Sequence, residues 1–278
     1  MSQAHTFPDT AKLFDVKGLV AVVTGGATGI GLMIATALEN NGAIVYIVGR
    51  RLEALEKAAD VTDRDSLRLL AAEIKSRHGH VNLLVNNAGV MLGHQPQLPK
   101  PADTSIAAYQ ELLWNTEDFG SFDTNFRVNV SGVWFCTVAF LELLHAGNES
   151  EWARTNGVTS QVLTISSLAS LRRDSGVFSL SYSLSKAATT HLGKMMAHYL
   201  KDWKIRSNVI VPGVFPSEMT DGVVDEASVG ATTPVGRLGD TEDMGGLVLF
   251  LASRAGAYVD GGLHVIDGGR LLSMPSTF

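Results

Sequence analysis

The stretch Leu19-Val-Ala-Val-Val-Thr-Gly-Gly-Ala-Thr-Gly-Ile-Gly31 decides the fold of this chain of 278 residues. Its first five residues are apolar and predict a buried strand, and a helical pattern over residues 32–41 follows the glycines directly. A glycine-rich turn between a strand and a helix is typical of a dinucleotide-binding unit. A turn without a ligand is the alternative, but the flanking strand and helix favour dinucleotide binding.

Each glycine of this turn has a physical role. Gly25 permits the tight turn, because glycine adopts backbone angles that other residues avoid. Gly29 lets the backbone approach a pyrophosphate at the positive end of the helix, and Gly31 permits close packing of that helix.

The alternation of apolar runs and helical stretches continues along the whole chain. We expect strands at 44–48, 81–85, 161–167, 206–211 and 263–267, and helices at 52–59, 65–78, 119–144, 182–202 and 242–252. This pattern predicts an α/β fold with one doubly wound, Rossmann-like parallel sheet. It forms a single domain, residues 16–278, after an N-terminal arm, residues 1–15.

Two long stretches, residues 90–115 and 214–239, lack a clear periodic pattern. The first contains three prolines and is long for a connection within a compact domain, so we expect an irregular substrate mouth or subunit contact. The second would suit a flap over a site.

Composition excludes several classes of function. A net charge of −6 without a long basic run argues against a nucleic-acid surface. The single cysteine, Cys136, excludes an internal disulfide and fits a reducing compartment. Residues 1–15 lack the features of a secretory signal, and the apolar run 247–252 is too short to span a bilayer. We therefore expect a soluble cytoplasmic protein.

The segment His78-Gly-His80 has a spacing that occurs in metal sites. It ends a predicted helix, however, and no cysteine or carboxylate cluster lies near it in the sequence. We interpret it as a solvated helix end and expect no metal.

Tyr182 and Lys186 are four residues apart at the start of a predicted helix, so both side chains share one face. A neighbouring ammonium lowers the pKa of a phenol and makes it a better proton donor and acceptor. The pair therefore predicts proton transfer, although the same spacing also arises by chance on helix surfaces.

The strand at 44–48 ends in Gly49-Arg-Arg51 and carries no acidic residue there. Sites that prefer NAD usually offer a carboxylate to the ribose at this point, whereas an arginine suits the 2′-phosphate of NADP. We therefore predict that Arg50 binds NADP(H); solvated charges at a helix start are the alternative.

A set of short motifs, in order along the chain, carries a family resemblance. They are Thr24-Gly-x-x-x-Gly-x-Gly31, Asn86-Asn-Ala-Gly89, Asn129, Ile165-Ser-Ser167, Tyr182-x-x-x-Lys186 and Pro212-Gly213. Each motif is weak alone, but their order and spacing are specific. With them the chain resembles the short-chain dehydrogenase/reductase family over residues 16–269.

The resemblance implies hydride transfer between a nicotinamide and a ketone or secondary alcohol, here of an apolar or aromatic small molecule. It implies that Tyr182 protonates the carbonyl oxygen, that Lys186 lowers the pKa of this tyrosine and holds the nicotinamide ribose, and that Ser167 binds the carbonyl. Asn129 would hold a water in a proton relay. The span before Tyr182 is slightly long, so Ser166 or Ser170 remains an alternative to Ser167.

The resemblance also implies the cofactor contacts. The pyrophosphate turn would comprise Thr24, Gly25, Gly29, Ile30 and Gly31, with Asp60 and Val61 at the adenine, Asn87 at the ribose and Phe215 at the nicotinamide amide. The short segment between Arg51 and Asp60 departs from the family pattern. A homotetramer or dimer formed through the predicted helices 119–144 and 182–202 is expected.

Two other functions stay open at this point. An isomerase or dehydratase would retain the nucleotide without net oxidation, and a nucleotide-sensing protein would bind it without turnover.

Overall fold

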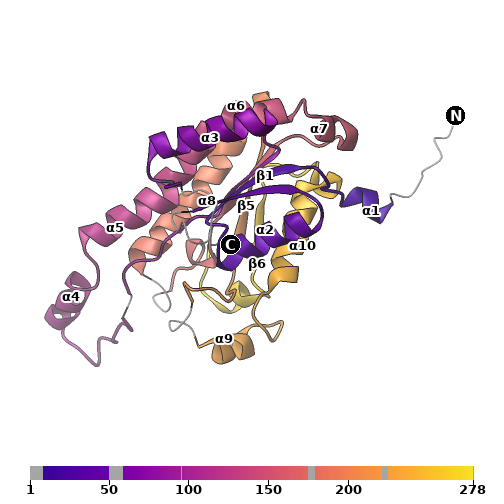
Figure 1. The fold of residues 1–278 in the computed structure, drawn as a ribbon. Helices are drawn as coiled ribbons and strands as arrows, with labels where there is room; N and C mark the ends of the chain where they lie inside the picture. The colour runs from indigo at the N-terminus through magenta and orange to yellow at the C-terminus, as the bar shows by residue number, and fades with distance from the viewer. Residues whose placement is uncertain (1–8, 50–58, 95, 175–178, 221–224, 278) are drawn as a thin grey trace.

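A parallel sheet lies at the centre of the protein, between layers of helices (Figure 1). It has six strands in the order β2-β1-β3-β4-β5-β6. The computed structural model describes residues 9–49, 59–94, 96–174, 179–220 and 225–277. The strands are β1 (Val20–Thr24), β2 (Ile44–Val48), β3 (Leu83–Asn86), β4 (Gln161–Ile165), β5 (Arg206–Pro212) and β6 (Leu263–Ile266). The predicted doubly wound parallel sheet is confirmed, and each predicted strand is found, with its ends shifted by at most a residue or two.

Helices cover both faces of the sheet (Figure 1). One face carries α2 (Gly29–Asn40) and α10 (Thr241–Ala252), and the other carries α3 (Arg64–His78), α6 (Val133–Gly147) and α8 (Leu180–Leu200). Because both faces are covered, a strand such as β1 has four consecutive apolar residues, all buried, rather than an alternation of apolar and polar ones.

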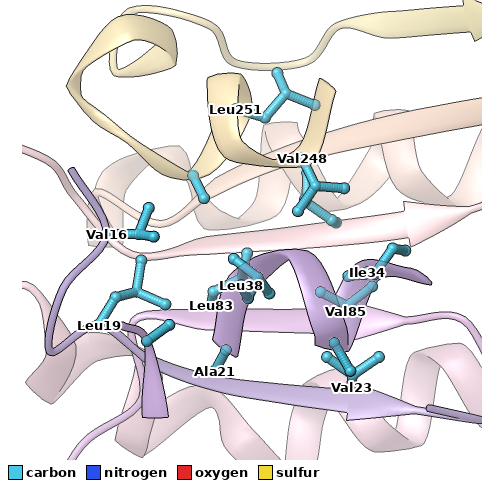
Figure 2. Packing of buried hydrophobic residues seen from close by; sticks show 14 of the residues in the cluster. Val16, Leu19, Ala21, Val23, Ile34, Leu38, Leu83, Val85, Val248 and Leu251 are labelled. Carbon is cyan, nitrogen blue, oxygen red and sulfur yellow. The ribbon is translucent and has the colours of Figure 1, made fainter. Parts of the chain in front are cut away.

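Side chains alternate between the two faces along each strand. Ala21 and Val23 of β1 point toward α2 and α10, where Figure 2 shows them near Ile34 and Leu38. Val20 and Val22 belong instead to the core on the other face, which includes Phe140 of α6 and Met196 of α8.

The strand order reverses at β1, which has β2 on one side and β3 on the other. Ligands of doubly wound sheets bind in the crevice outside the carboxyl ends of the strands at such a reversal. The ends of β1 and β3 are therefore the place to look for a site.

The two stretches predicted to be irregular each contain a helix, so that prediction was wrong in part. Helix α4 (Ile106–Trp114) lies within residues 90–115 and is capped by Ser105, whose Oγ accepts a hydrogen bond from the amide of Ala108. Helix α9 (Glu226–Thr232) lies within residues 214–239 and is capped by Asp225. Their caps and helix-forming residues outweigh the nearby prolines and glycines that suggested loops.

Two further short helices were not foreseen. Helix α7 (Glu151–Asn156) precedes β4, and the single turn α1 (Thr10–Leu13) lies within the predicted N-terminal arm. The helix predicted at 52–59 falls almost entirely outside the described residues.

The single helix predicted at 119–144 is interrupted. It consists of α5 (Phe119–Phe126), a π-helical turn (Arg127–Gly132) and α6. Asn129 lies in this π-helical turn, and its main-chain oxygen accepts a hydrogen bond from Oγ1 of Thr189 at 2.7 Å. Such turns are frequent at functional sites, so the interruption directs attention to Asn129.

In the described part of the chain, one helical run, Phe119–Gly147, is long and apolar enough to cross a membrane by length and composition alone. In this structure 44% of the apolar window is buried: Val133, Phe140 and Leu144 pack in the core, whereas Trp134 and Val138 are exposed. Packing in the core therefore accounts for part of its apolar character.

Candidate active site

The turn after β1 forms a cradle that only glycines permit. Gly25 and Gly29 adopt positive φ angles of 63° and 52°. A Cβ atom at Gly31 would lie 2.1 Å from the carbonyl oxygen of Gly25, which is impossible for two non-bonded atoms. Backbone groups at the start of α2 are thus left open to a ligand, at the positive end of the helix.

Thr24 and Asn87 join this turn to the one that follows β3. Oγ1 of Thr24 accepts hydrogen bonds from the amides of Asn87 and Ala88, both at 3.0 Å. The Asn87 amide group in turn donates to the carbonyl oxygens of Thr24 (2.9 Å) and Gly25 (3.0 Å). These hydrogen bonds fix the two turns against each other.

A cavity of about 620 Å³ extends along the carboxyl edge of the sheet from the end of β2 to α8. Predicted site residues that line it are Gly25, Gly29, Ile30, Gly31, Asp60, Val61, Asn87, Tyr182 and Lys186. The glycine cradle, its helix N-terminus and the length of the cavity fit a bound dinucleotide.

Tyr182 and Lys186 lie in the first two turns of α8. Ser179 caps this helix, and its Oγ accepts a hydrogen bond from the amide of Tyr182 at 3.0 Å. Both side chains are buried against the protein yet reach the cavity, and Nζ of Lys186 lies 5.9 Å from the centre of the Tyr182 ring. The structure therefore brings a phenol and an ammonium together at one end of the cavity.

The expected lowering of the tyrosine pKa by Lys186 is not what this geometry gives. Burial raises the pKa of the Tyr182 phenol, and a hydrogen bond with the side chain of Ser167 opposes this only in part. Burial also lowers the pKa of Lys186 to about 8, so its ammonium group loses its proton at a lower pH than that of an exposed lysine. The phenol consequently stays protonated near neutral pH, which is the form that a proton donor needs.

The three candidate serines have different partners. Oγ of Ser166 lies 2.6 Å from Oγ1 of Thr190 and donates to the carbonyl oxygen of Lys186 at 3.0 Å, so this hydroxyl is engaged by α8. Oγ of Ser170 accepts a hydrogen bond from the same threonine at 3.1 Å. Ser166 contributes to the cavity wall, but Ser167 is the one of the three that bonds to the side chain of Tyr182.

Asn129 is fully buried and links three segments. Its Oδ1 accepts from the amide of Val90 at 2.9 Å, and its Nδ2 donates to the carbonyl oxygen of Val90 and to Oγ of Ser185, both at 2.9 Å. A Cβ atom at Gly89 would lie 3.2 Å from Oδ1 of Asn129 and 3.4 Å from Nζ of Lys186. Asn129 and Lys186 therefore meet at the same glycine.

Comparison with known proteins identifies the group to which this arrangement belongs. A family model described as "Enoyl-(Acyl carrier protein) reductase" matches residues 25–270. A relative, the short-chain dehydrogenase/reductase PhomF of Diaporthe leptostromiformis, is 44% identical over 96% of each chain. The chain belongs to the short-chain dehydrogenase/reductase family.

Solved structures agree with this assignment. The RhlG/NADP active-site complex of Pseudomonas aeruginosa superposes with a TM-score of 0.78, is 31% identical, and the match covers 94% of this chain and 99% of that one. A gluconate 5-dehydrogenase of Burkholderia cenocepacia in complex with NADP and tartrate has a TM-score of 0.75 and 26% identity, with coverages of 96% and 100%. As a member of this family, the protein is an oxidoreductase that acts on small molecules with a nicotinamide cofactor.

The family pattern suggested three other residues, Asp60, Phe215 and Arg50. Oδ1 of Asp60 accepts hydrogen bonds from the amide and hydroxyl of Thr62, both at 2.8 Å, which fixes its position at the cavity wall. The side chain of Phe215 is buried in the core against Gly239, and the residue does not line the cavity. Arg50 lies outside the described residues.

The sequence interpretation missed several residues of the site. Ser217, Glu218 and Met219 line the cavity, and Ser217 packs so closely on Gly29 that a Cβ there would lie 2.9 Å from the serine Cβ. Their place just after the carboxyl end of β5 was a usable signal, because that edge of the sheet binds ligands.

Proposed function

We propose that the protein is an NADP(H)-dependent reductase that transfers a hydride between the nicotinamide and a ketone or secondary alcohol of an apolar or aromatic small molecule. The observation that carries this proposal is the position of the Tyr182 phenol, beside Lys186 and in the same cavity as the glycine cradle. The phenol is protonated near neutral pH, which is the form that can donate a proton to a ketone, although burial makes it a weaker acid.

Each residue has a separate part in the proposed reaction. The bound nicotinamide supplies or accepts the hydride. Tyr182 donates its phenolic proton to the carbonyl oxygen, and the hydroxyl of Ser167 stabilises the negative charge that develops there. Lys186 keeps positive charge near the phenol and holds the ribose, while Asn129 fixes the wall beside Lys186 and serves the relay that returns a proton.

The end of β2 supports a preference for NADP(H). Val48 and Gly49 line the cavity, and Arg50 follows them directly in the sequence. The Pseudomonas and Burkholderia structures, whose descriptions name NADP, support the same choice. Substituting Arg50→Ala should weaken the binding of NADPH far more than that of NADH; an equal loss would refute this role.

Apolar side chains in the cavity that contains the phenol support an apolar or aromatic substrate. Val90, Val128 and Met219 line the same cavity as Tyr182. Burying these apolar surfaces against a ring or hydrocarbon group of the substrate would favour binding. A panel of aliphatic, aromatic and sugar ketones, each tested for NADPH oxidation, distinguishes this class from polyols.

The decisive test is the substitution Tyr182→Phe, which removes one oxygen atom. Turnover should fall about 10³-fold while NADPH binds with nearly unchanged affinity, because the hydroxyl contributes to proton transfer and little to binding. Surviving turnover would refute the assignment. Product formation without net NADPH consumption would indicate an isomerase or dehydratase, and tight NADPH binding without turnover on any ketone would indicate a sensor.

Pairing with a second copy through α6 and α8 is part of the proposal. An apolar groove of about 480 Å³ runs between these helices and is lined by Trp134, Val138, Tyr199 and Trp203. All four side chains are partly exposed, as expected for a surface that another helix pair covers. Val138→Glu should shift a dimer or tetramer toward monomer, as measured by light scattering.

We also propose a cytoplasmic location, which cell fractionation tests.

A further inference from the structure

Two asparagines one helical turn apart make the same set of hydrogen bonds. Asn125 lies at position i−4 from Asn129 and is also fully buried. Its Oδ1 accepts from the amide of Leu92 at 3.1 Å, and its Nδ2 donates to the carbonyl oxygen of Leu92 at 3.1 Å and to Oγ of Ser181 at 2.7 Å. Asn129 bonds in the same way to Val90 and Ser185.

The two serines both lead to the backbone of Tyr182. Ser185, which accepts from Asn129, donates through Oγ to the carbonyl oxygen of Tyr182 at 2.8 Å. Ser181, which accepts from Asn125, lies 3.4 Å from Oγ of Ser179, and that oxygen accepts from the amide of Tyr182 at 3.0 Å. The peptide groups on either side of Tyr182 are thus each tied, through serines, to one asparagine.

A separate contact holds the main chain at the start of α8. Glu117 accepts hydrogen bonds from the amides of Leu180 (2.5 Å) and Ser181 (3.1 Å). The helix would therefore remain in place without Asn125. Asn125 instead fixes the distance between two parts of the site. One is the segment after β3, which forms a wall of the cavity, and the other is the first turn of α8, which carries the phenol.

We propose that Asn125 is a positioning residue for Tyr182, matching Asn129 one turn earlier and fixing the phenol against the segment that contains Val90 and Leu92. This inference rests on the proposed function, because it assigns Asn125 a role only through the phenol of Tyr182. The physical ground is that a rigid, fully bonded network holds a reacting group within a fraction of an ångström of its productive place.

The chain provides a matched control in Asn82. Oδ1 of Asn82 accepts from the amide of Val20 at 3.0 Å, and its Nδ2 donates to the carbonyl oxygen of Gly147 (3.1 Å) and Oγ of Ser150 (2.9 Å). This is the same set of bonds at a buried position, but it lies just before β3, at the opposite edge of the sheet. Loss of either asparagine should cost similar stability.

The test compares Asn125→Leu with Asn82→Leu in the full-length protein, using NADPH and a ketone that the wild type reduces. For Asn125→Leu, kcat should fall about 10- to 100-fold, while the dissociation constant of NADPH changes less than about twofold. The apparent pKa of the kcat profile should also move. Asn82→Leu should keep kcat and the pH profile of the wild type at a comparable loss of stability in urea unfolding.

A milder pair guards against failure to fold. Ser181→Ala removes the link toward Tyr182 and leaves the bonds between Asn125 and Leu92. Ser150→Ala removes the serine partner of Asn82 and, in addition, the cap of α7, so its cost in stability should be the larger of the two. Only Ser181→Ala should lower kcat and move its pH profile. If neither member of the Asn125 and Ser181 pair differs from its control, the positioning role is refuted.

The outcome is separable from that of the proposed function. If wild type does not reduce any ketone, or Tyr182→Phe keeps its turnover, the proposed function fails. If wild type is active and Tyr182→Phe is inactive, but Asn125→Leu retains wild-type kcat, the positioning role alone fails.

Discussion

Each edge of the sheet buries a cation, but the two cations differ in how many hydrogen bonds they donate to the protein. At the amino edge, the guanidinium of Arg206 donates to five oxygens, those of Gln161 Oε1 and of the carbonyls of Thr159, Leu251, Gly256 and Val259. At the carboxyl edge, Nζ of Lys186 donates to one acceptor within the described residues, the carbonyl oxygen of Ile165 at 3.0 Å, and it faces the cavity.

Burial lowers the pKa of both cations, to about 10 for Arg206 and about 8 for Lys186. Arg206 therefore stays charged at neutral pH and bonds to protein oxygens through both terminal nitrogens, while its buried Nε has no hydrogen-bond partner in the described part of the chain. Lys186 loses its charge more readily and has donors to spare beside the cavity. A buried cation by itself indicates little about function, whereas unused donors next to a cavity indicate a ligand.

Removing the cation at the carboxyl edge should have the largest effect on turnover. In Lys186→Met, kcat for ketone reduction should fall about 10³-fold, because the proton donor loses its charged neighbour. The free energy of unfolding should stay the same or rise, since a buried ammonium with one acceptor is costly to desolvate. Initial rates of NADPH oxidation measure kcat, and urea unfolding measures the free energy of unfolding. A loss of kcat smaller than tenfold would show that the cation at the carboxyl edge is no more important for turnover than the one at the amino edge.

Removing the cation at the amino edge should give the opposite result. Arg206→Met leaves several buried carbonyl groups without donors and should lower the free energy of unfolding by about 3 kcal/mol, about 150-fold in the unfolding equilibrium. The kcat per folded molecule should change less than about twofold. Arg254→Met, which loses one exposed bond to the carbonyl oxygen of Gly157, is the control and should cost less than about 0.5 kcal/mol.

Two adjacent serines sharpen the contrast within the carboxyl edge itself. Ser167→Ala should lower kcat about 10²-fold, because a donor aimed at the developing charge is lost. Ser166→Ala should leave kcat within a few-fold and lower stability by about 1 kcal/mol, since its hydroxyl bonds to α8. Steady-state kinetics of both variants test this, and a larger loss of kcat in Ser166→Ala would reverse the assignment.

The pH dependence gives the smallest and most specific effect. The pKa of Lys186 is lowered to about 8, so its ammonium is present below that pH and is lost as the pH rises through it. Reductive kcat should therefore decline above about pH 8, by about tenfold per pH unit for a single ionisation. A rate that rises through this range would contradict the role of the charged lysine; NADPH binding measured over the same range is the control.

Much of the fold could be predicted from the sequence, because strands, turns and helices depend mainly on residues close to one another in the chain. The apolar run before Gly25 and the helix after Gly31 predicted a strand, a turn and a helix that the structure contains. Local signals also misled, since prolines and glycines concealed the capped helices α4 and α9. Asn125 and Asn129 are four residues apart in the segment predicted as one helix, and Ser181 and Ser185 are four apart in another, so the equal spacing indicated paired contacts between the two segments.

The sequence by itself determined the succession of the six strands and of the main helices between them, the glycine cradle and the shared face of Tyr182 and Lys186, because each depends on neighbours within a few residues. Only the tertiary structure decided which serine bonds to Tyr182, which direction its pKa takes, and that Asn125 meets Leu92 and Ser181, 33 and 56 residues away. Burial and contacts between distant segments arise when helices pack on the sheet, and no local pattern encodes that packing.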